Sequence, residues 1–448
     1  MASVDKSDGW TVAATGDGAI AALETADGIV ALTSCDTSSA DAKLPVLSDS
    51  TVEQLALLGP EPDEPAVARG GGVRLKDVAT DVGLGERVDT YGGLVADLDG
   101  DGWQDIFYSR HFDIPAVALG GPDGFRQPEH YPFEAIDRHN CGAADIDADG
   151  TVDIFCAVGR AKGRVLLRHD LAVSAAHEDG GVHKDAAGAH DPFGRGRDAI
   201  FLRLDDDEYP ELFIITAPDR VDGTPGTNRF FRNVGGELVP APEIGLDRST
   251  GGACAFAADV DGDGDEDLLH CVESPRDGRL EGLRVYRNDE GTLKERSRPL
   301  KVKPMKDIAA AVADLDGDRW PDLVQLNSTR LRISLGTRKG FKEAFSAPIT
   351  KGKAIATGDV DGDGNDDIYV ARASASENLE DVVLLSRPGK KTFKTKQLRL
   401  PAVEGNAEDV IAIDHDQNGL MDFLVLNGRL GKKGPVQLIA SYKLSAGP

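Results

Sequence analysis

A nine-residue acidic segment of the form D-x-D-x-D-G-x-x-D recurs along this chain of 448 residues. Seven copies, four complete and three altered, begin at Asp97, Asp145, Arg203, Asp259, Asp314, Asp359 and Asp414. Consecutive copies are separated by 45 to 58 residues. A period in this range is typical of repeat proteins, in which each repeat forms one small structural unit. The chain is therefore predicted to fold as an array of similar units.

Each copy supplies the oxygen ligands that Ca²⁺ prefers, about six to eight of them around one ion. The side chains at positions 1, 3, 5 and 9 and the main-chain carbonyl at position 7 can surround the ion, while glycine at position 6 allows a positive φ. We expect five or six structural calcium ions. The predicted ligands are Asp97, Asp99, Asp101, Trp103 and Asp105; Asp145, Asp147, Asp149, Thr151 and Asp153; Asp259, Asp261, Asp263, Asp265 and Asp267; Asp314, Asp316, Asp318 and Asp322; Asp359, Asp361, Asp363, Asn365 and Asp367; and Asp414, Asp416, Asn418 and Asp422.

The alternative of an EF-hand does not fit the residues around the segment. An EF-hand requires a bidentate Glu at position 12 and a helix on each side of the loop. No copy has Glu at position 12, and short apolar runs such as residues 94–96 and 106–108 flank the first copy. Such runs, bounded by turn residues, indicate buried strands. Each acidic segment is therefore predicted to connect two β-strands.

The altered copies are predicted to bind calcium less well. Arg203 replaces the first carboxylate of the third copy, and we expect its guanidinium to neutralise Asp205 and Asp207, so that this loop holds no ion. Arg319 replaces the glycine of the fifth copy, where a positive φ costs roughly 1 kcal/mol or more. Aspartates are also common in ordinary turns, but several copies in phase favour a metal site.

The net charge of −27 is almost entirely explained by the acidic segments, because their positions 1, 3, 5 and 9 hold 26 Asp and Glu residues. This acidity argues against a nucleic-acid partner, which would need a basic face. No apolar run approaches the ~20 residues of a membrane span. We therefore expect neither nucleic-acid binding nor a membrane span.

Four of the five cysteines flank two acidic segments in matching positions. Cys141 lies four residues before the second copy and Cys156 eleven after its first residue; Cys254 and Cys271 lie five before and twelve after the start of the fourth. If each segment connects two antiparallel strands, the two cysteines of a pair would face each other. The two pairs differ by one residue in register, so the two disulfides would lie on opposite faces of their sheets. We predict disulfides Cys141–Cys156 and Cys254–Cys271 and an oxidising compartment. Cys35 has no assigned role.

The predicted location is secreted, extracellular or at the cell surface. The disulfides and the extracellular calcium concentrations that such loops usually need both favour this location. Residues 1–10 lack the charged-then-apolar pattern of a signal peptide.

After each loop the chain continues into further strand-like stretches, for example residues 228–239, 283–295, 331–343 and 382–394. About four short strands per repeat match a β-propeller blade. The order of strand, acidic loop, strand and N-x-L-F-x-N-x-G-G-x-F resembles the FG-GAP/VCBS repeat family, which includes integrin α-subunit propellers and cartilage acidic protein-like proteins. The resemblance covers about Gly72 to the C-terminus. It implies an all-β, seven-bladed β-propeller with calcium-binding loops.

We expect three parts in the chain. Residues 1–58 are predicted to be a small segment of short strands and one helix, residues 59–71 a linker, and residues 72–448 the propeller. Residues 73–79 are expected to complete blade seven, which would close the ring and remove an exposed sheet edge.

The resemblance places ligand binding at the funnel opposite the calcium loops, and implies a binding or adhesion module, a lectin-like domain or a lyase. Counting back six to eight residues from each loop gives a candidate rim of Tyr91, Arg138, His139, Arg195, Arg197, Lys306 and Lys353. A cationic rim would attract an anionic ligand, such as an acidic glycan or a protein partner. The open alternative is that these side chains pair with neighbouring acids, Asp137 and Asp198 among them.

A binding module is favoured over an enzyme. The enzymatic alternative is a carbohydrate-active, polysaccharide lyase-like protein in which His139 is the base and Arg138 or Arg197 neutralises charge. A purely structural surface protein with a protein partner is a third possibility. His169, His177, His183 and His190 lie in an insertion whose spacing matches no zinc pattern, so a metal site there is not favoured.

Overall fold

The computed structural model describes residues 10–15, 18–25, 28–35, 67–70, 72–127, 133, 135–159, 171–174, 182–184, 189, 196–216, 226–247, 250–272, 282–374, 377–389, 393–400, 407–429 and 432–444. The chain divides into two units, Met1–Glu64 and Pro65–Pro448. The first unit contains an antiparallel sheet of β1 (Trp10–Thr15), β2 (Gly18–Thr25) and β3 (Gly28–Cys35). The helix expected before residue 58 lies outside the described residues.

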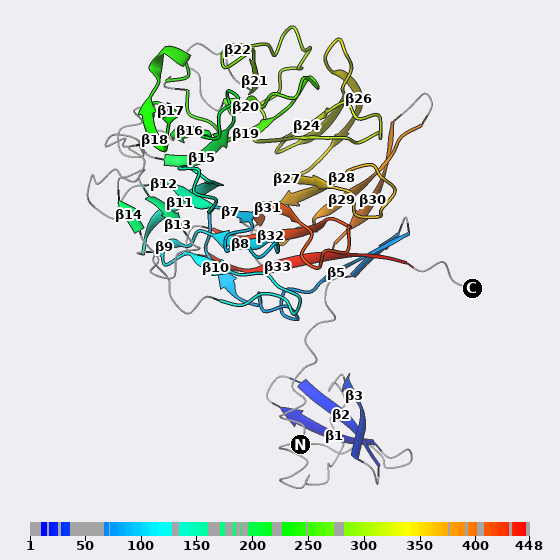
Figure 1. The fold of residues 1–448 in the computed structure, drawn as a ribbon. Helices are drawn as coiled ribbons and strands as arrows, with labels where there is room; N and C mark the ends of the chain where they lie inside the picture. The colour runs from blue at the N-terminus through cyan, green and yellow to red at the C-terminus, as the bar shows by residue number, and fades with distance from the viewer. Residues whose placement is uncertain are drawn as a thin grey trace. The chain divides into compact units, whose positions relative to one another are not determined.

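The second unit is a seven-bladed β-propeller of antiparallel sheets (Figure 1). Blades 1 to 3 consist of β7 (Gly93–Ala96), β8 (Asp105–Tyr108) and β10 (Ala116–Ala118); β11 (Ile136–Ala144), β12 (Asp153–Val158), β13 (Leu171–Ser174) and β14 (Val182–Lys184); and β15 (Gly196–Leu202), β16 (Glu211–Thr216), β17 (Arg229–Val234) and β18 (Glu237–Pro240). Blades 4 and 5 consist of β19 (Cys254–Ala258), β20 (Asp267–Val272), β21 (Gly282–Asn288) and β22 (Leu293–Glu295); and β23 (Ala309–Ala313), β24 (Asp322–Asn327), β25 (Arg330–Leu335) and β26 (Lys342–Pro348).

Blades 6 and 7 consist of β27 (Gly352–Gly358), β28 (Asp367–Arg372), β29 (Val382–Arg387) and β30 (Lys394–Arg399); and β31 (Ala407–Ile413), β32 (Asp422–Arg429), β33 (Lys432–Lys443), β5 (Val73–Asp77) and β4 (Val67–Gly70). Two short strands cross between blades: β6 (Arg87–Val88) pairs with β33, and β9 (His111–Asp113) pairs with β11. A 3-10 turn, η3 (Pro242–Ile244), follows β18.

The second strand of each blade is an apolar run because both of its faces are covered by neighbouring blades. Every residue of β8, β16 and β20, for example, is buried. Alternate side chains point to opposite neighbours: Phe107 belongs to the apolar cluster between blades 1 and 2, whereas Ile106 and Tyr108 belong to the cluster between blades 7 and 1. Seven such clusters, one for each pair of adjacent blades, form the core.

The two ends of the propeller meet in blade 7. Strand β5 pairs with β33 from Val73 opposite Lys443 to Asp77 opposite Ile439. The side chains of Val73 and Leu75 are fully buried. The edge of β33 is therefore paired rather than exposed, which removes a site of aggregation.

Both predicted disulfides are confirmed. Cys141 pairs with Cys156 between β11 and β12, and Cys254 pairs with Cys271 between β19 and β20. The first lies in the cluster between blades 1 and 2, and the second in the cluster between blades 4 and 5. The disulfide of blade 2 therefore faces the preceding blade, and the disulfide of blade 4 faces the following blade. This difference is what the one-residue difference in register predicts.

Candidate functional site

The acidic loops join the first and second strands of the blades and share one backbone geometry. In the fourth loop, the carboxylate of Asp259 at position 1 accepts hydrogen bonds from the backbone N–H of Gly262 at 2.7 Å and of Gly264 at 3.0 Å. Gly264 at position 6 has a φ of 97°, which favours glycine. The first aspartate therefore closes the turn, and the sequence of the loop explains its shape.

The carboxylate at position 9 ties the loop to the third strand of its blade. Asp267 is fully buried and accepts hydrogen bonds from the N–H of Val260 at 3.0 Å and of Asn288 at 2.7 Å. The same arrangement, one bond within the loop and one from the end of the third strand, holds for Asp105, Asp322, Asp367 and Asp422. Position 9 thus has a structural role whether or not it also contacts an ion.

Burial shifts the titration of these carboxyls upward. Desolvation raises the pKa of Asp105 to about 6, of Asp267 to about 7 and of Asp367 to about 8, against the opposing effect of their backbone hydrogen bonds. Neighbouring loop carboxylates raise these pKa values further. The loops therefore concentrate negative charge in a way that a bound cation would relieve.

The aspartate at position 3 presents an oxygen with no partner inside the protein. This oxygen is Oδ1, and it is buried without a hydrogen-bond partner in four loops, in Asp99, Asp261, Asp316 and Asp361. The other oxygen has a different use: Asp261 Oδ2 lies 2.8 Å from Arg287 Nη1, and Asp361 Oδ2 contacts Arg387. A buried acceptor without a partner is costly in a native structure. The unpartnered Oδ1 therefore indicates that the loop binds a ligand.

The donor set of the loops fits calcium. In the fourth loop, one oxygen from each of Asp259, Asp261 and Asp263 lies within 4.8 Å of the others. Oxygens bound about 2.3–2.6 Å from a single Ca²⁺ would lie at such separations. The residues that would hold the ion are those at positions 1, 3 and 5, joined by the carbonyl at position 7.

The altered loops differ from expectation in one respect. Asp205 of the third loop lies 3.6 Å from the guanidinium of Arg232, on β17, and not against Arg203, whose backbone N–H donates to Glu266 at 2.6 Å. The structure thus gives Asp205 a cationic neighbour, Arg232, that the sequence did not indicate; the absence of an ion from this loop stays a prediction. Arg319 has a φ of 68°, the strained conformation that the missing glycine predicts.

The candidate rim is less cationic than its sequence suggests. Arg138 is fully buried, with its guanidinium 5.3 Å from the ring centre of Phe133, so it cannot contact a ligand in the funnel. Lys353 Nζ lies 2.7 Å from Glu408 Oε1. Arg197 lies beside Asp198, whose pKa desolvation raises to about 7.

The other predicted rim residues fall into three groups. Tyr91 and His139 lie together, with ring centres 4.5 Å apart. Lys306 is exposed, and its polar groups are not without a partner. Arg195 lies outside the described residues, as do His169, His177 and His190 of the insertion; His183 lies on β14.

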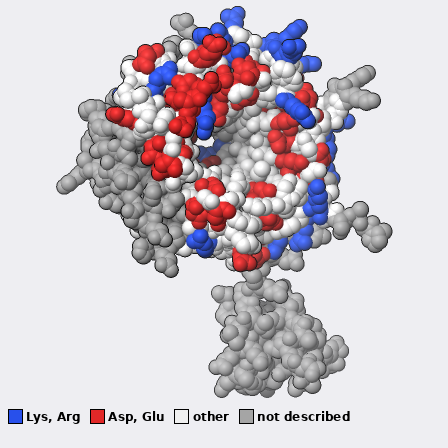
Figure 2. Space-filling view, viewed as in Figure 1, with Lys and Arg blue, Asp and Glu red and all other residues white. Residues whose placement is uncertain are grey.

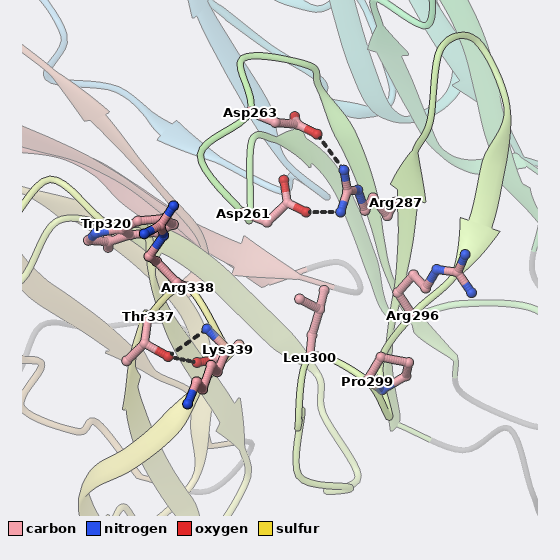
Figure 3. A pocket seen from close by; sticks show the side chains of 11 residues that line it. Asp261, Asp263, Arg287, Arg296, Pro299, Leu300, Trp320, Thr337, Arg338 and Lys339 are labelled. Carbon is pink, nitrogen blue, oxygen red and sulfur yellow. Dashed lines mark hydrogen bonds and ion pairs between the residues drawn. The ribbon is translucent and has the colours of Figure 1, made fainter.

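A cavity of about 470 Å³ lies between blades 4 and 5, and sequence reasoning missed it. It is lined on one side by Asp261 and Asp263 of the fourth loop, and on the other by Trp320 of the fifth loop (Figure 3). Its remaining walls include Arg287, Arg296, Pro299, Leu300, Thr337, Arg338, Lys339 and Gly340. No single segment carries a signal for this cavity, because five separate segments of blades 4 and 5 form it.

Four basic side chains line the cavity: Arg287, Arg296, Arg338 and Lys339. On the face shown in Figure 2, Asp and Glu gather in separate clusters around the central opening, with Lys and Arg among and outside them. Arg287 is held by Asp261 and Asp263. Arg338 and Lys339, by contrast, have no carboxylate partner among the residues that the structure describes.

The ring of seven sheets and its interstrand acidic loops define a β-propeller built from repeats with candidate cation sites. A family model for the FG-GAP-like repeat matches residues 97–156, 203–270, 314–370 and 359–425, together more than half of the chain. The chain therefore belongs to the FG-GAP-like repeat family. Propellers of this family are typically modules that bind proteins or other ligands.

Two solved structures are similar to this chain at low sequence identity. A structure of BBS1N in complex with ARL6DN, soaked with lead, has a TM-score of 0.50 and 10% identity, and the match covers 86% of this chain and 98% of that chain. An Agrocybe aegerita lectin that recognises non-reducing terminal N-acetylglucosamine has a TM-score of 0.40 and 17% identity over 75% of this chain and 89% of that chain. The sequence matches none of the curated proteins.

Within the part of the chain that the structure describes, no helix has the length and apolarity needed to cross a bilayer.

Proposed function

We propose that this protein is a calcium-stabilised extracellular β-propeller that binds an anionic ligand. The main support for calcium binding is the buried Oδ1 of the aspartate at position 3, which lacks a hydrogen-bond partner in four loops. The same atom is unpartnered in Asp99, Asp261, Asp316 and Asp361. This repetition is expected if each of these four loops binds a cation in the same way. The two disulfides support an oxidising, extracellular location.

The ligand class follows from the cavity between blades 4 and 5. The guanidinium of Arg338 and the ammonium of Lys339 suit carboxylate or sulfate groups. Trp320 offers an aromatic face to the same cavity, and aromatic rings commonly supply large contact areas at binding sites. We therefore propose an acidic glycan as the ligand; an acidic segment of a protein partner has similar chemistry.

The funnel rim is a weaker candidate for the same role. Its basic residues face acidic neighbours, as Lys353 does with Glu408, or are buried, as Arg138 is. The lyase alternative uses Arg138 or Arg197 to neutralise charge. The burial of Arg138 leaves only Arg197 for that role, and Arg197 lies beside Asp198.

The test is a binding assay with the calcium-loaded protein and a panel of neutral and acidic polysaccharides, scored for retention and for new chain ends. We expect retention of acidic chains, weakening with salt because the attraction is screened, and no new chain ends. The double variant Arg338→Glu/Lys339→Glu should lose retention. Lys342→Glu, which reverses one lysine charge at an exposed position of β26 outside the cavity, is the control for charge reversal and should keep it.

Two outcomes would contradict the proposal. Equal retention by the double variant and the wild-type protein would exclude the cavity. New chain ends would identify an enzyme and return attention to His139. If no glycan is retained, an acidic protein partner remains to be tested with the same variants.

A further inference from the structure

Two histidines and one aspartate lie together where β9 pairs with the start of β11, between blades 1 and 2. His111 lies on β9 and is paired across the sheet with Asp137 on β11. His139 follows two residues after Asp137, so its side chain lies on the same face of β11. The ring of Tyr91 packs against both imidazoles, with ring centres 5.0 Å from that of His111 and 4.5 Å from that of His139.

The tautomer of His139 is fixed by the backbone. Its Nδ1 is hydrogen-bonded to the carbonyl oxygen of Gly196. A carbonyl only accepts, so Nδ1 carries the proton and donates it, which leaves the lone pair on Nε2 available. Histidines that bind metals commonly donate their other N–H to a backbone carbonyl in this way.

The free side of His139 faces a carboxylate. His139 Nε2 and Asp137 Oδ1 lie 3.5 Å apart, and neither atom has a hydrogen-bond partner although both are buried. The side chains are only 5% and 7% exposed. Two buried acceptors that face each other without a shared hydrogen are unfavourable unless a cation lies between them.

The distances suit a metal ion better than a hydrogen bond. His111 Nε2 lies 3.2 Å from the same Asp137 Oδ1. A charged hydrogen bond would bring such atoms to about 2.7–2.9 Å. Two ligands that each lie about 2.0–2.1 Å from a tetrahedral zinc ion are about 3.3 Å apart, close to both of the observed separations.

We propose that His111, Asp137 and His139 bind a divalent transition metal of the zinc class. Two imidazole nitrogens and one carboxylate oxygen are a donor set that Zn²⁺ prefers and Ca²⁺ does not. Asp89 Oδ2 lies 3.7 Å from His111 Nδ1, on the side of the ring away from Asp137. His111 is 19% exposed, so water can reach the site and complete the coordination.

Gly159 provides the space for this ion. A Cβ at Gly159 would lie 2.7 Å from His139 Nε2 and still closer to Asp137 Oδ2. Any side chain at this position would therefore press against the carboxylate of Asp137 and the imidazole of His139, beside the unpartnered Nε2. Gly159 has no positive φ that would by itself demand glycine.

The test uses the full chain, stripped with a chelator and reloaded with excess Ca²⁺ so that the oxygen-rich loops do not compete. Co²⁺ is titrated and followed by its visible absorption, which reports tetrahedral coordination, and Zn²⁺ is titrated by calorimetry. We expect one tight equivalent. An outer-shell change typically costs about 10–100-fold in metal affinity, so loss of a ligand in His111→Ala or Asp137→Asn should cost at least about 100-fold.

Two further variants distinguish this site from metal binding elsewhere in the chain. Gly159→Ala keeps all three ligand residues in the sequence but crowds Asp137 and His139, and it should also abolish the tight equivalent. A variant with His169, His177, His183 and His190 replaced by Asn should retain it. The proposal is overturned if the wild-type protein binds no stoichiometric Co²⁺ or Zn²⁺, if His111→Ala binds as the wild-type protein does, or if only the four-histidine variant loses binding; circular dichroism melts verify that each variant is folded.

Discussion

Removal of calcium is expected to destabilise the propeller by an amount that depends on the number of occupied loops. Four loops present the unpartnered Oδ1. An ion that binds only the folded state adds RT ln(1 + [Ca²⁺]/Kd), or about 0.4–1.4 kcal/mol per site at free calcium of one to ten times Kd. Four sites thus contribute about 1.6–5.6 kcal/mol.

This free energy corresponds to a measurable shift in melting temperature. The unit Pro65–Pro448 is expected to have an unfolding entropy of about 0.8 kcal/mol/K. Chelation should therefore lower Tm by about 2–7 °C. The assay is differential scanning calorimetry with a chelator and with Ca²⁺ from about 0.1 to 10 mM, the range of extracellular sites. Mg²⁺ should give a smaller shift, because it requires near-ideal octahedral geometry and loses water reluctantly.

A matched pair of variants in the fourth loop locates the effect. Asp261→Asn changes the residue whose Oδ1 is buried without a partner. Asp265→Asn makes the same change of charge four residues later, where only the main-chain carbonyl is a predicted ligand. Equilibrium dialysis should find one ion fewer in Asp261→Asn and no loss in Asp265→Asn. The reasoning is refuted if calcium leaves the wild-type Tm unchanged, or if the two variants bind equally.

Three further predictions follow from the same structure. Burial raises the pKa of Asp267 to about 7 and of Asp367 to about 8, above the unfolded value of about 3.9, so the folded state binds more protons than the unfolded state. The stability of the calcium-free protein should therefore fall as pH rises from about 4 to 8. A melting temperature in chelator that does not change across this range would contradict the prediction. Deletion of residues 1–77 exposes the edge of β33 and removes the buried Val73 and Leu75, worth about 3–6 kcal/mol; an unchanged melt would exclude this closure. Replacing Cys141 and Cys156 with Ala opens a loop of sequence separation 15 and should cost about 3 kcal/mol in urea unfolding, whereas an unchanged midpoint would show that the disulfide adds no stability.

The fold was predictable because one local pattern sets the whole architecture. The acidic loop fixes where two strands begin and end, and its period of 45 to 58 residues leaves room for two more strands per blade. The cysteines gave an independent register for two hairpins, which the structure confirms. Both signals are local in sequence, and that is why they could be interpreted without coordinates.

Contacts between blades were not predictable in the same way. Arg138 looked like a rim residue from its distance to the loop, yet its side chain is buried against Phe133. His111 was missed because β9 leaves blade 1 and pairs with β11 of blade 2. A crossing strand of three residues has no pattern of its own, so its partner appears only in the folded chain.

The cavity between blades 4 and 5 connects the two parts of the proposed function. Trp320 occupies position 7 of the fifth loop, and its backbone N–H donates to Asp318 at position 5, at 2.9 Å. Its ring lies against the fourth loop, since a Cβ at Gly262 would be 3.4 Å from Trp320 Cζ3. Each of these two loops has the buried, unpartnered oxygen at position 3. An ion in either loop would therefore hold one wall of the cavity, because the residues that form that wall belong to the same turn as the ligands of the ion. In the proposed function calcium would therefore do more than stabilise the ring: it would also fix the shape of the surface proposed to bind an anionic ligand.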